Sequence, residues 1–271
     1  MVKFYSASFN YDYSFPAVSL AYFLRYPNPY STHVFSTDVI DRSFDNATQR
    51  LTTVRLHLKK SKLPSAVLKI LPRSLMGASE KGDSQAYILE KSVVDIKEGW
   101  MTTESRNLEW TGVLSVIESQ DFKRGGHAVW DLVNGQKQII SEPERTHVTT
   151  TVALQSHIGE NIRRRRARMA ESAAQTADDG KEKMGFFKSW TTGSIQRSIE
   201  MIGLRRAEGA QPKATEGMKV VLERLRQGGL VAVLDGMRKD RELMFAGQSG
   251  LSLPSPPASG NAPASIDYHE D

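Results

Sequence analysis

The chain has 271 residues, a net charge of +5 and no cysteine. It can therefore form no disulfide, thiolate nucleophile or cysteine-ligated metal site, and its basic balance mildly favours anionic partners such as nucleic acid, acidic membranes or acidic proteins. No apolar run is long enough to cross a bilayer, and the first residues lack the apolar centre of a secretory signal, so we expect a soluble protein without a removable presequence.

The N-terminal part of the sequence predicts a strand, a short helix and a hairpin. Residues Lys3–Tyr11 alternate and are rich in aromatic side chains, which is typical of a strand. Ser14 is a suitable cap for a helix that Pro27 would close. Two further strands are expected at Thr32–Phe44 and Leu51–Lys60, joined by a turn.

The predicted helix carries one apolar face that ends in a cation. Phe15, Val18, Tyr22 and Arg25 recur at spacings of three, four and three. An arginine that faces a core is costly unless it is paired or meets an anion such as a phosphate or a carboxylate. Alternatively, Arg25 complements the helix dipole and extends into water, and the spacing alone favours this second interpretation because such helix-terminal cations are common.

The strand at Leu51–Lys60 has one basic face. One face carries Thr52, Val54, Leu56 and Leu58. The other, basic face carries Thr53, Arg55, His57 and Lys59. Periodicity is compatible with a half-solvated sheet whose basic residues lie outside. The following segment, Lys62–Gly77, is apolar with basic residues and two prolines. It is typical either of an interfacial membrane element or apolar lid, or of a core helix with a solvated edge.

The middle of the chain predicts more antiparallel strands. They are expected at Gln85–Ile96, Trp100–Glu109 and Val113–Phe122, because only short turns separate them. Residues 123–144 look like a long loop or an insert, and Arg145–His157 supplies a seventh strand.

The C-terminal part is charged and helical. Asn161–Lys183 has a cluster of arginines that could bind nucleic acid or anionic lipid, but it lacks an aromatic platform, which favours a solvated insert. Apolar residues at helical spacing follow in residues 185–203 and 215–226, with a polar break expected at 208–212. Residues 228–245 are predicted to be a helical extension, and 246–271 a disordered tail.

The sequence favours a ligand-binding protein over an enzyme. The histidines show no zinc-protease spacing, and no nucleophile elbow, phosphate-binding loop or dinucleotide fingerprint occurs. We therefore predict no catalytic residue, metal or cofactor. A curved antiparallel sheet with helices on one side makes a container, the architecture of a binding protein.

Four motifs, in order, resemble the PRELI/MSF1 domain family. They are RYPNPYSTHV (25–34), TTVRLHLKKSKLP (52–64), ILEKSVVD (88–95) and ESRNLEWTGVLSVIE (104–118). The resemblance implies an α+β fold in which a curved seven-stranded antiparallel sheet, helices and a lid loop enclose a lipid cavity, as in START and phosphatidylinositol-transfer proteins. The domain would cover 1–227, with inserts at about 123–144 and 161–183.

The same resemblance implies a function. Members of this family shuttle phospholipids across the mitochondrial intermembrane space, support cardiolipin synthesis when the cargo is phosphatidic acid, dock peripherally on anionic membranes and pair with a small twin-Cx9C protein. Arg25 would face the lipid phosphate. The other implied headgroup residues are His33, Arg55, Lys59 and Lys62, and the implied lid residues are Leu63, Val67, Leu68, Ile70 and Leu71.

Two features of the sequence bear on which branch of the family it resembles. The PNPYS motif favours the phosphatidic acid branch over the phosphatidylserine branch, and Lys213 is the candidate match for basic residues late in that branch's long helix. A phosphatidylserine carrier is the alternative within the family. From other classes, an adaptor that binds RNA or an acidic protein through its basic insert remains open, and an esterase or lipase is a third possibility.

Overall fold

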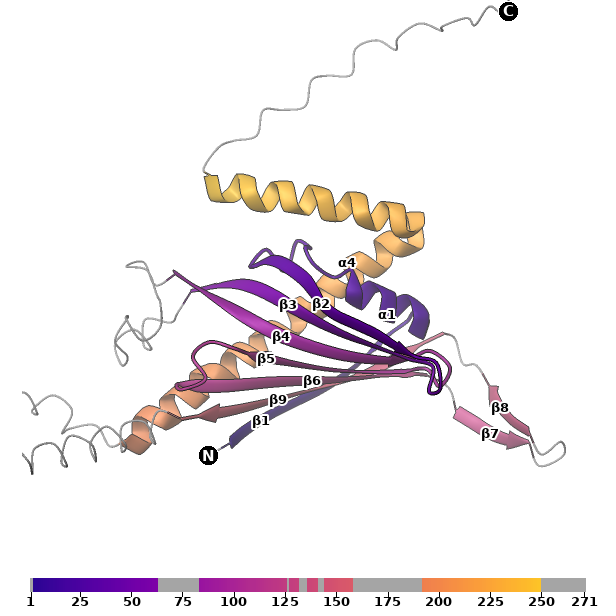
Figure 1. Cartoon of the computed structure of the whole chain (residues 1–271), viewed down its shortest axis with the longest axis horizontal. Coiled ribbons are helices and arrows are strands. Elements are labelled where there is room, and N and C mark those ends of the chain that lie inside the picture. The colour runs from indigo at the N-terminus through magenta and orange to yellow at the C-terminus, as the bar shows by residue number, and fades with distance from the viewer. Residues whose placement is uncertain are drawn as a thin grey trace, which may run out of the picture.

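The structure is a computed structural model that describes residues 2–62, 83–125, 127–131, 136–140, 144–157 and 192–249 (Figure 1). Its elements, in chain order, are β1 (Val2–Tyr11), α1 (Phe15–Phe23), β2 (Val34–Asp45), β3 (Arg50–Lys62), β4 (Asp83–Asp95), β5 (Trp100–Asn107), β6 (Leu114–Arg124), β7 (His127–Asp131), β8 (Gln136–Ile140), β9 (Thr146–Ser156) and α4 (Thr192–Ser249).

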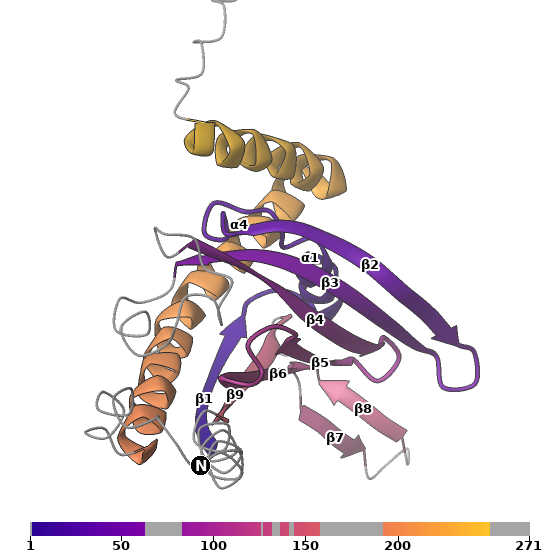
Figure 2. The ribbon, with the colours of Figure 1, turned by 60° about the vertical axis from the view of Figure 1, so that its left-hand side comes forward.

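A seven-stranded antiparallel sheet dominates the fold, in the order β1-β9-β6-β5-β4-β3-β2. The sheet bows around the helices, and α4 runs across it (Figure 2). This confirms the predicted fold class. Pairing of the first strand with the last brings Phe9 opposite Val148 and places the N-terminal strand at one edge.

Side-chain alternation explains why these segments are strands. In β9 every second residue is buried, from Thr146 to Ser156, so one face packs inward and the other is more open. The β4–β5 turn contains Gly99 at φ 75°, a backbone conformation that side chains rarely adopt. A Cβ there would also lie 2.8 Å from the side chain of Arg124. The turn therefore requires glycine.

One compact core joins both helices to the sheet. The apolar face of α1 contacts buried residues of the sheet and of α4. The members of this core are Tyr11, Phe15, Val18, Ala21, Tyr22, Val94, Met101, Phe122, Val148, Met218, Val221, Leu222 and Val233. Each large side chain buried here contributes about 1.5–3 kcal/mol, so this cluster is the main source of stability.

Helix α4 differs from the prediction. No break occurs at residues 208–212, because the helix continues through Pro212. It bends instead at Gly228 and Gly229, whose backbone angles are not helical. The second arm, residues 230–249, turns sharply away from the first (Figure 1). There Val233 enters the core, and the Arg224 Nη1 lies 2.6 Å from the Asp240 Oδ2, which ties the two arms together.

Of the remaining predicted segments, the structure describes part of one, and the others lie outside the described residues. The region expected to be an irregular insert contains the hairpin β7–β8, in which His127 pairs with Ile140. The lid residues 63–71, the basic run 161–183 and the tail from 250 lie outside the described residues. Within the described part of the chain, no helix combines the length and apolar character needed to cross a membrane.

The ion pair between the arms of α4 predicts a stability difference. Asp240→Ala should lower the free energy of unfolding by about 1–3 kcal/mol, because it leaves the partly buried Arg224 guanidinium without its carboxylate. The matched control is Asp235→Ala, which removes an exposed partner of Arg238 and should cost less than about 1 kcal/mol. Urea denaturation measures both. Equal losses would contradict this role for the pair.

Candidate functional site

A cavity of about 1090 Å³ lies between the inner face of the sheet and the first arm of α4. This volume is slightly above the usual range of about 300–1,000 Å³ for ligand pockets. Much of its wall is apolar. The apolar lining residues include Phe9, Ile88, Leu114, Val116, Phe122, Val152, Leu154 and Met218.

Small residues on α4 explain why the space is hollow. Gly203, Ala207, Ala210 and Ala214 recur at spacings of four, three and four, so they share one helical face, and all four line the cavity. The short side chains of the three alanines leave space in front of the curved sheet, whereas at Gly203 the sheet comes close, since an added Cβ would lie 3.2 Å from Leu114. One turn later Met218 begins the large residues of the core. A single helix therefore borders both the cavity and the core.

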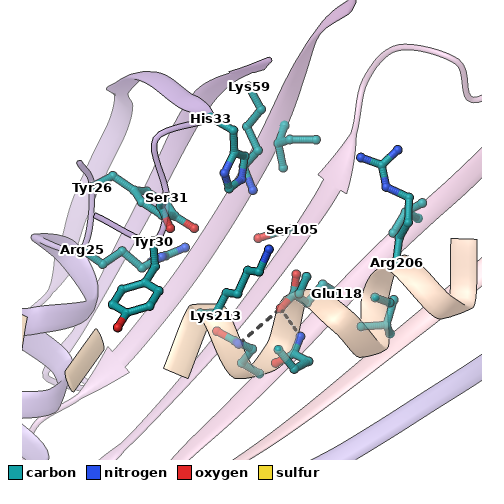
Figure 3. A pocket seen from close by; sticks show the side chains of 18 of the residues that line it. Arg25, Tyr26, Tyr30, Ser31, His33, Lys59, Ser105, Glu118, Arg206 and Lys213 are labelled. Carbon is teal, nitrogen blue, oxygen red and sulfur yellow. Dashed lines mark hydrogen bonds between the residues drawn. The ribbon is translucent and has the colours of Figure 1, made fainter. Parts of the chain in front are cut away.

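Basic residues gather along one part of the cavity wall (Figure 3). The cations are Arg25 from the connection after α1, Lys59 from β3, and Arg206 and Lys213 from α4, and His33 from the same connection as Arg25 lies beside them. Within the described residues, neither Lys59 nor Lys213 forms an ion pair. As far as the described residues show, these two lysines therefore present positive charge to the cavity without a paired carboxylate.

The sequence predicted part of this wall. Arg25, His33 and Lys59 were candidates and line the cavity, as does Lys213. Arg206 was missed, although its spacing of seven from Lys213 places both on one helical face and could have revealed it. The side chain of Lys62 lies outside the described residues.

Arg25 sits just beyond the end of α1. The helix ends at Phe23, with Leu24 as its C-cap, so Arg25 lies in the turn that follows. Its Nη1 donates to the Tyr22 carbonyl at 2.9 Å, and its guanidinium lies 3.6 Å from the centre of the Tyr22 ring. The other end of the guanidinium pairs with Glu90. The side chain is only 12% exposed, and it is held rigidly at the cavity edge.

Glu90 is the centre of a buried charge cluster. It is 1% exposed and accepts hydrogen bonds from Arg25, from Arg55 Nε at 2.9 Å and from the Tyr22 hydroxyl at 2.9 Å. Burial by itself would raise the pKa of Glu90, but Arg25, the hydrogen bond to His57 and the charge of Arg55 together hold it well below its usual range. Glu90 is therefore ionised at neutral pH.

Arg55 lies behind Arg25 and does not line the cavity. Its side chain is buried, and its Nη1 donates to the Phe23 carbonyl at 3.0 Å. Thr53, Arg55 and His57 are all buried. The interpretation that placed the basic face of this strand in solvent is therefore wrong, because Glu90 draws that face inward.

The buried cluster carries one surplus positive charge. Arg25 and Arg55 share the single carboxylate of Glu90. Burial lowers the pKa of His57, so its imidazole is neutral at pH 7. The uncompensated charge is felt strongly next to the cavity, because the surroundings are poor in water. This end of the cavity favours an anion.

His33 adds a neutral group to the wall. Its desolvation in the cavity and the nearby charges of Lys59, Arg206 and Lys213 lower the pKa of His33 to about 4. At neutral pH the imidazole can therefore both donate and accept a hydrogen bond without adding charge. Within the described residues, no group of three or more histidines and carboxylates is placed to hold a metal ion.

Comparisons with known proteins agree with the geometry. The model of the PRELI-like family matches residues 16–166. Protein UPS1, mitochondrial, of Saccharomyces cerevisiae is 39% identical over 123 residues, which are 45% of this chain and 65% of that protein. PRELI domain-containing protein 1, mitochondrial, of Bos taurus is 31% identical over 118 residues, 44% of this chain and 50% of that protein. The chain thus spans about half to two thirds of the length of these relatives.

A solved structure shows a weaker likeness. The Zhui aromatase/cyclase from Streptomyces sp. R1128 superposes with a TM-score of 0.42 and 9% sequence identity, over 84% of this chain and 98% of that chain. No argument about function follows from a likeness at this level.

The charge cluster predicts a large cost for removing its carboxylate. Glu90→Gln should lower the free energy of unfolding by about 3–5 kcal/mol, because two buried guanidinium groups then lack a counter-charge. Glu104→Gln, on an exposed position of β5, is the matched control and should change it by less than about 0.5 kcal/mol. Urea denaturation at pH 7 measures both, and similar values would contradict the cluster's role.

The shifted pKa values of Glu90 and His57 predict that the protein loses stability in acid. The folded-state pKa of Glu90 lies well below its usual 4.5, so its contribution is complete above about pH 4.5 and is lost as the pH falls through the folded-state pKa. The folded-state pKa of His57 lies below 6.5, so the unfolded chain binds that proton first and stability also declines below about pH 6.5. The free energy of unfolding, measured by urea denaturation at a series of pH values, should decrease steadily from pH 7 to pH 3. In Glu90→Gln the decrease below about pH 4.5 should be smaller.

Proposed function

Because the chain belongs to the PRELI-like family, we propose that it is a phospholipid transfer protein that carries phosphatidic acid between the outer and inner mitochondrial membranes, in support of cardiolipin synthesis. The observation that carries the proposal is the cationic wall at one part of an otherwise largely apolar cavity. The mitochondrial designation of both relatives supports the compartment, which we take to be the intermembrane space.

The cavity suits a molecule with two chemically different parts. Acyl chains gain about 0.8 kcal/mol for each methylene that leaves water, and the walls formed by the sheet and by the small-residue face of α4 offer such surroundings. A polar headgroup would be left at the wall formed by Arg25, Lys59 and Lys213. A phospholipid has both parts, whereas a nucleotide or a sugar phosphate has no use for the apolar walls.

The cations favour a phosphate group. A phosphomonoester carries between about one and two negative charges near neutral pH and offers several strong acceptors. Arg25 is fixed by Glu90 and Tyr22 and can meet the phosphate without losing rotamer freedom. Lys59 and Lys213 can close around it as point charges, and neutral His33 can donate a hydrogen bond.

The proposal includes exchange with membranes but no bond making. We assign the protein no catalytic residue and no cofactor. Residues 63–71, which lie outside the described part, are proposed as the lid that meets an anionic membrane surface and closes over the cargo. A small twin-Cx9C protein is proposed as the heterodimer partner.

A phosphatidylserine carrier is the second candidate. The carboxylate of Glu118 lines the same cavity as the cations. Phosphatidic acid carries no cationic group that could use it, whereas the serine headgroup carries an ammonium. The motifs of the sequence favour the first candidate, and Glu118 favours the second.

Transfer between liposomes tests the proposal. The double variant Lys59→Met and Lys213→Met should lower phosphatidic acid transfer by at least about tenfold, because each lysine supplies a charge-assisted hydrogen bond to the phosphate. Lys91→Met, on an exposed position of β4, is the matched control. These lysines are preferable to Arg25, since Arg25→Glu would place a second carboxylate beside Glu90 and unfold the chain. Undiminished transfer by the double variant would contradict the proposal.

A titration of His33 supplies an independent check. An anionic headgroup beside the ring stabilises the imidazolium, so binding of phosphatidic acid should raise the pKa of His33 from about 4. Nuclear magnetic resonance follows the ring proton across the pH range with and without lipid, and the resonance is assigned by its loss in His33→Asn. A pKa that does not rise when phosphatidic acid is bound would place the phosphate elsewhere.

A further inference from the structure

Glu118 is a carboxylate inside a cavity whose other charged groups are mostly cations. It lies on β6, and its side chain is seen between Lys213 and Arg206 (Figure 3). Two amides hold it in place. The Nε2 atoms of Gln211 and Gln120 donate to the same oxygen, Oε1, at 3.2 and 3.3 Å. No described residue donates to Oε2, so this oxygen keeps its full capacity to accept.

Gln211 provides a second acceptor at the same place. It lines the cavity from α4, and the residue is only 8% exposed. Its Oε1 is buried and, within the described part of the chain, has no hydrogen-bond partner. A rotated amide would not solve this, because it would place the carbonyl oxygen against the Glu118 carboxylate. Buried acceptors without a donor are rare, and this one belongs to a side chain that lines the cavity and holds Glu118.

We infer that Glu118 and Gln211 form an acceptor subsite for an O–H or N–H donor carried by the headgroup of the cargo. The inference rests on the proposed function, and it extends the cargo to phospholipids whose phosphate bears an ammonium or hydroxyl substituent. A cationic ammonium would gain most, because it also meets the charge of Glu118. A hydroxyl substituent would use the same two acceptors without the charge.

The position of the subsite fits such a headgroup. Glu90, Ser105 and Glu118 are register partners on three neighbouring strands, β4, β5 and β6. Strands lie about 4.8 Å apart, so the backbone of Glu118 is roughly 10 Å from that of Glu90, the residue that holds Arg25. On α4, Gln211 precedes Lys213 by two residues. A phosphate at the cationic wall therefore leaves its substituent facing the subsite.

The subsite also divides the cavity by charge. A phosphate lying directly over Glu118 would be repelled, so the carboxylate confines phosphate to the part of the wall near Arg25 and Lys59. A bare phosphomonoester has no substituent to offer and would leave both acceptors unmet. Loss of Glu118 should therefore affect phosphatidic acid and substituted phospholipids differently, which a purely structural role could not produce.

Transfer of several lipids from one set of vesicles tests the subsite. Donor liposomes contain phosphatidic acid, phosphatidylserine, phosphatidylethanolamine and phosphatidylglycerol in equal amounts, and transferred lipids are counted by mass spectrometry. Glu118→Gln removes the charge, and Gln211→Leu removes the orphan oxygen. Glu216→Gln, on an exposed position of α4, is the matched control.

The expected result is a headgroup-dependent loss. Both variants should lower the transfer of substituted lipids relative to phosphatidic acid, by about tenfold for Glu118→Gln with ammonium lipids. A loss confined to phosphatidylglycerol would support a hydroxyl donor instead. Thermal unfolding of each variant identifies a fall in stability.

Two outcomes would overturn the subsite. Equal losses for all four lipids, with or without lower stability, would mean that Glu118 only anchors α4. No change in either variant would mean that the acceptors meet no headgroup. The proposed function fails separately, when the unaltered chain moves no phosphatidic acid from vesicles that contain this lipid alone.

Discussion

A single buried carboxylate, shared by two arginines, is the interaction on which the rest of the structure depends. Glu90 joins the end of α1, through Arg25 and Tyr22, to the middle of β3, through Arg55. Because one negative charge serves two guanidinium groups, the cluster holds the fold together and still leaves positive charge at the cavity edge. Stability and ligand attraction therefore come from the same few atoms. Any change that balanced the charge better would weaken the proposed function.

The first arm of α4 borders both the cavity and the hydrophobic core. From Gly203 to Ala214 its cavity face combines glycine and alanine with Arg206, Gln211 and Lys213, and its next turns supply Met218, Val221 and Leu222 to the core. The core compensates for the apolar side chains that line the cavity and therefore pack less closely. The same helix therefore borders the cavity at one end and contributes to the core at the other.

The sequence predicted the strands and helices well, but not the side-chain contacts that join elements distant in the chain. Alternation located the seven strands of the sheet, and the motifs at 25–34 and 52–64 pointed to Arg25, His33 and Lys59, which line the cavity, because both signals are local. The bond between Arg55 and Glu90 joins residues 35 positions apart, and the one between Glu118 and Gln211 joins residues 93 positions apart. Neither can be derived from spacing along one element. The expected break at residues 208–212 was wrong, because tertiary contacts of the helix, such as the hydrogen bond from Gln211 to Glu118 and the burial of Met218, override the helix-breaking tendency of Pro212.

The bend at Gly228 and Gly229 changes where the folding unit ends. The two glycines look like the natural limit of a domain, yet the chain beyond them returns to the body of the protein, where Val233 is fully buried in the core formed by the sheet, α1 and α4. A fragment cut at residue 227 would lose this contact and leave apolar side chains of the interior facing water. The second arm of α4 is therefore part of the core of the folded unit and not an appendage to it.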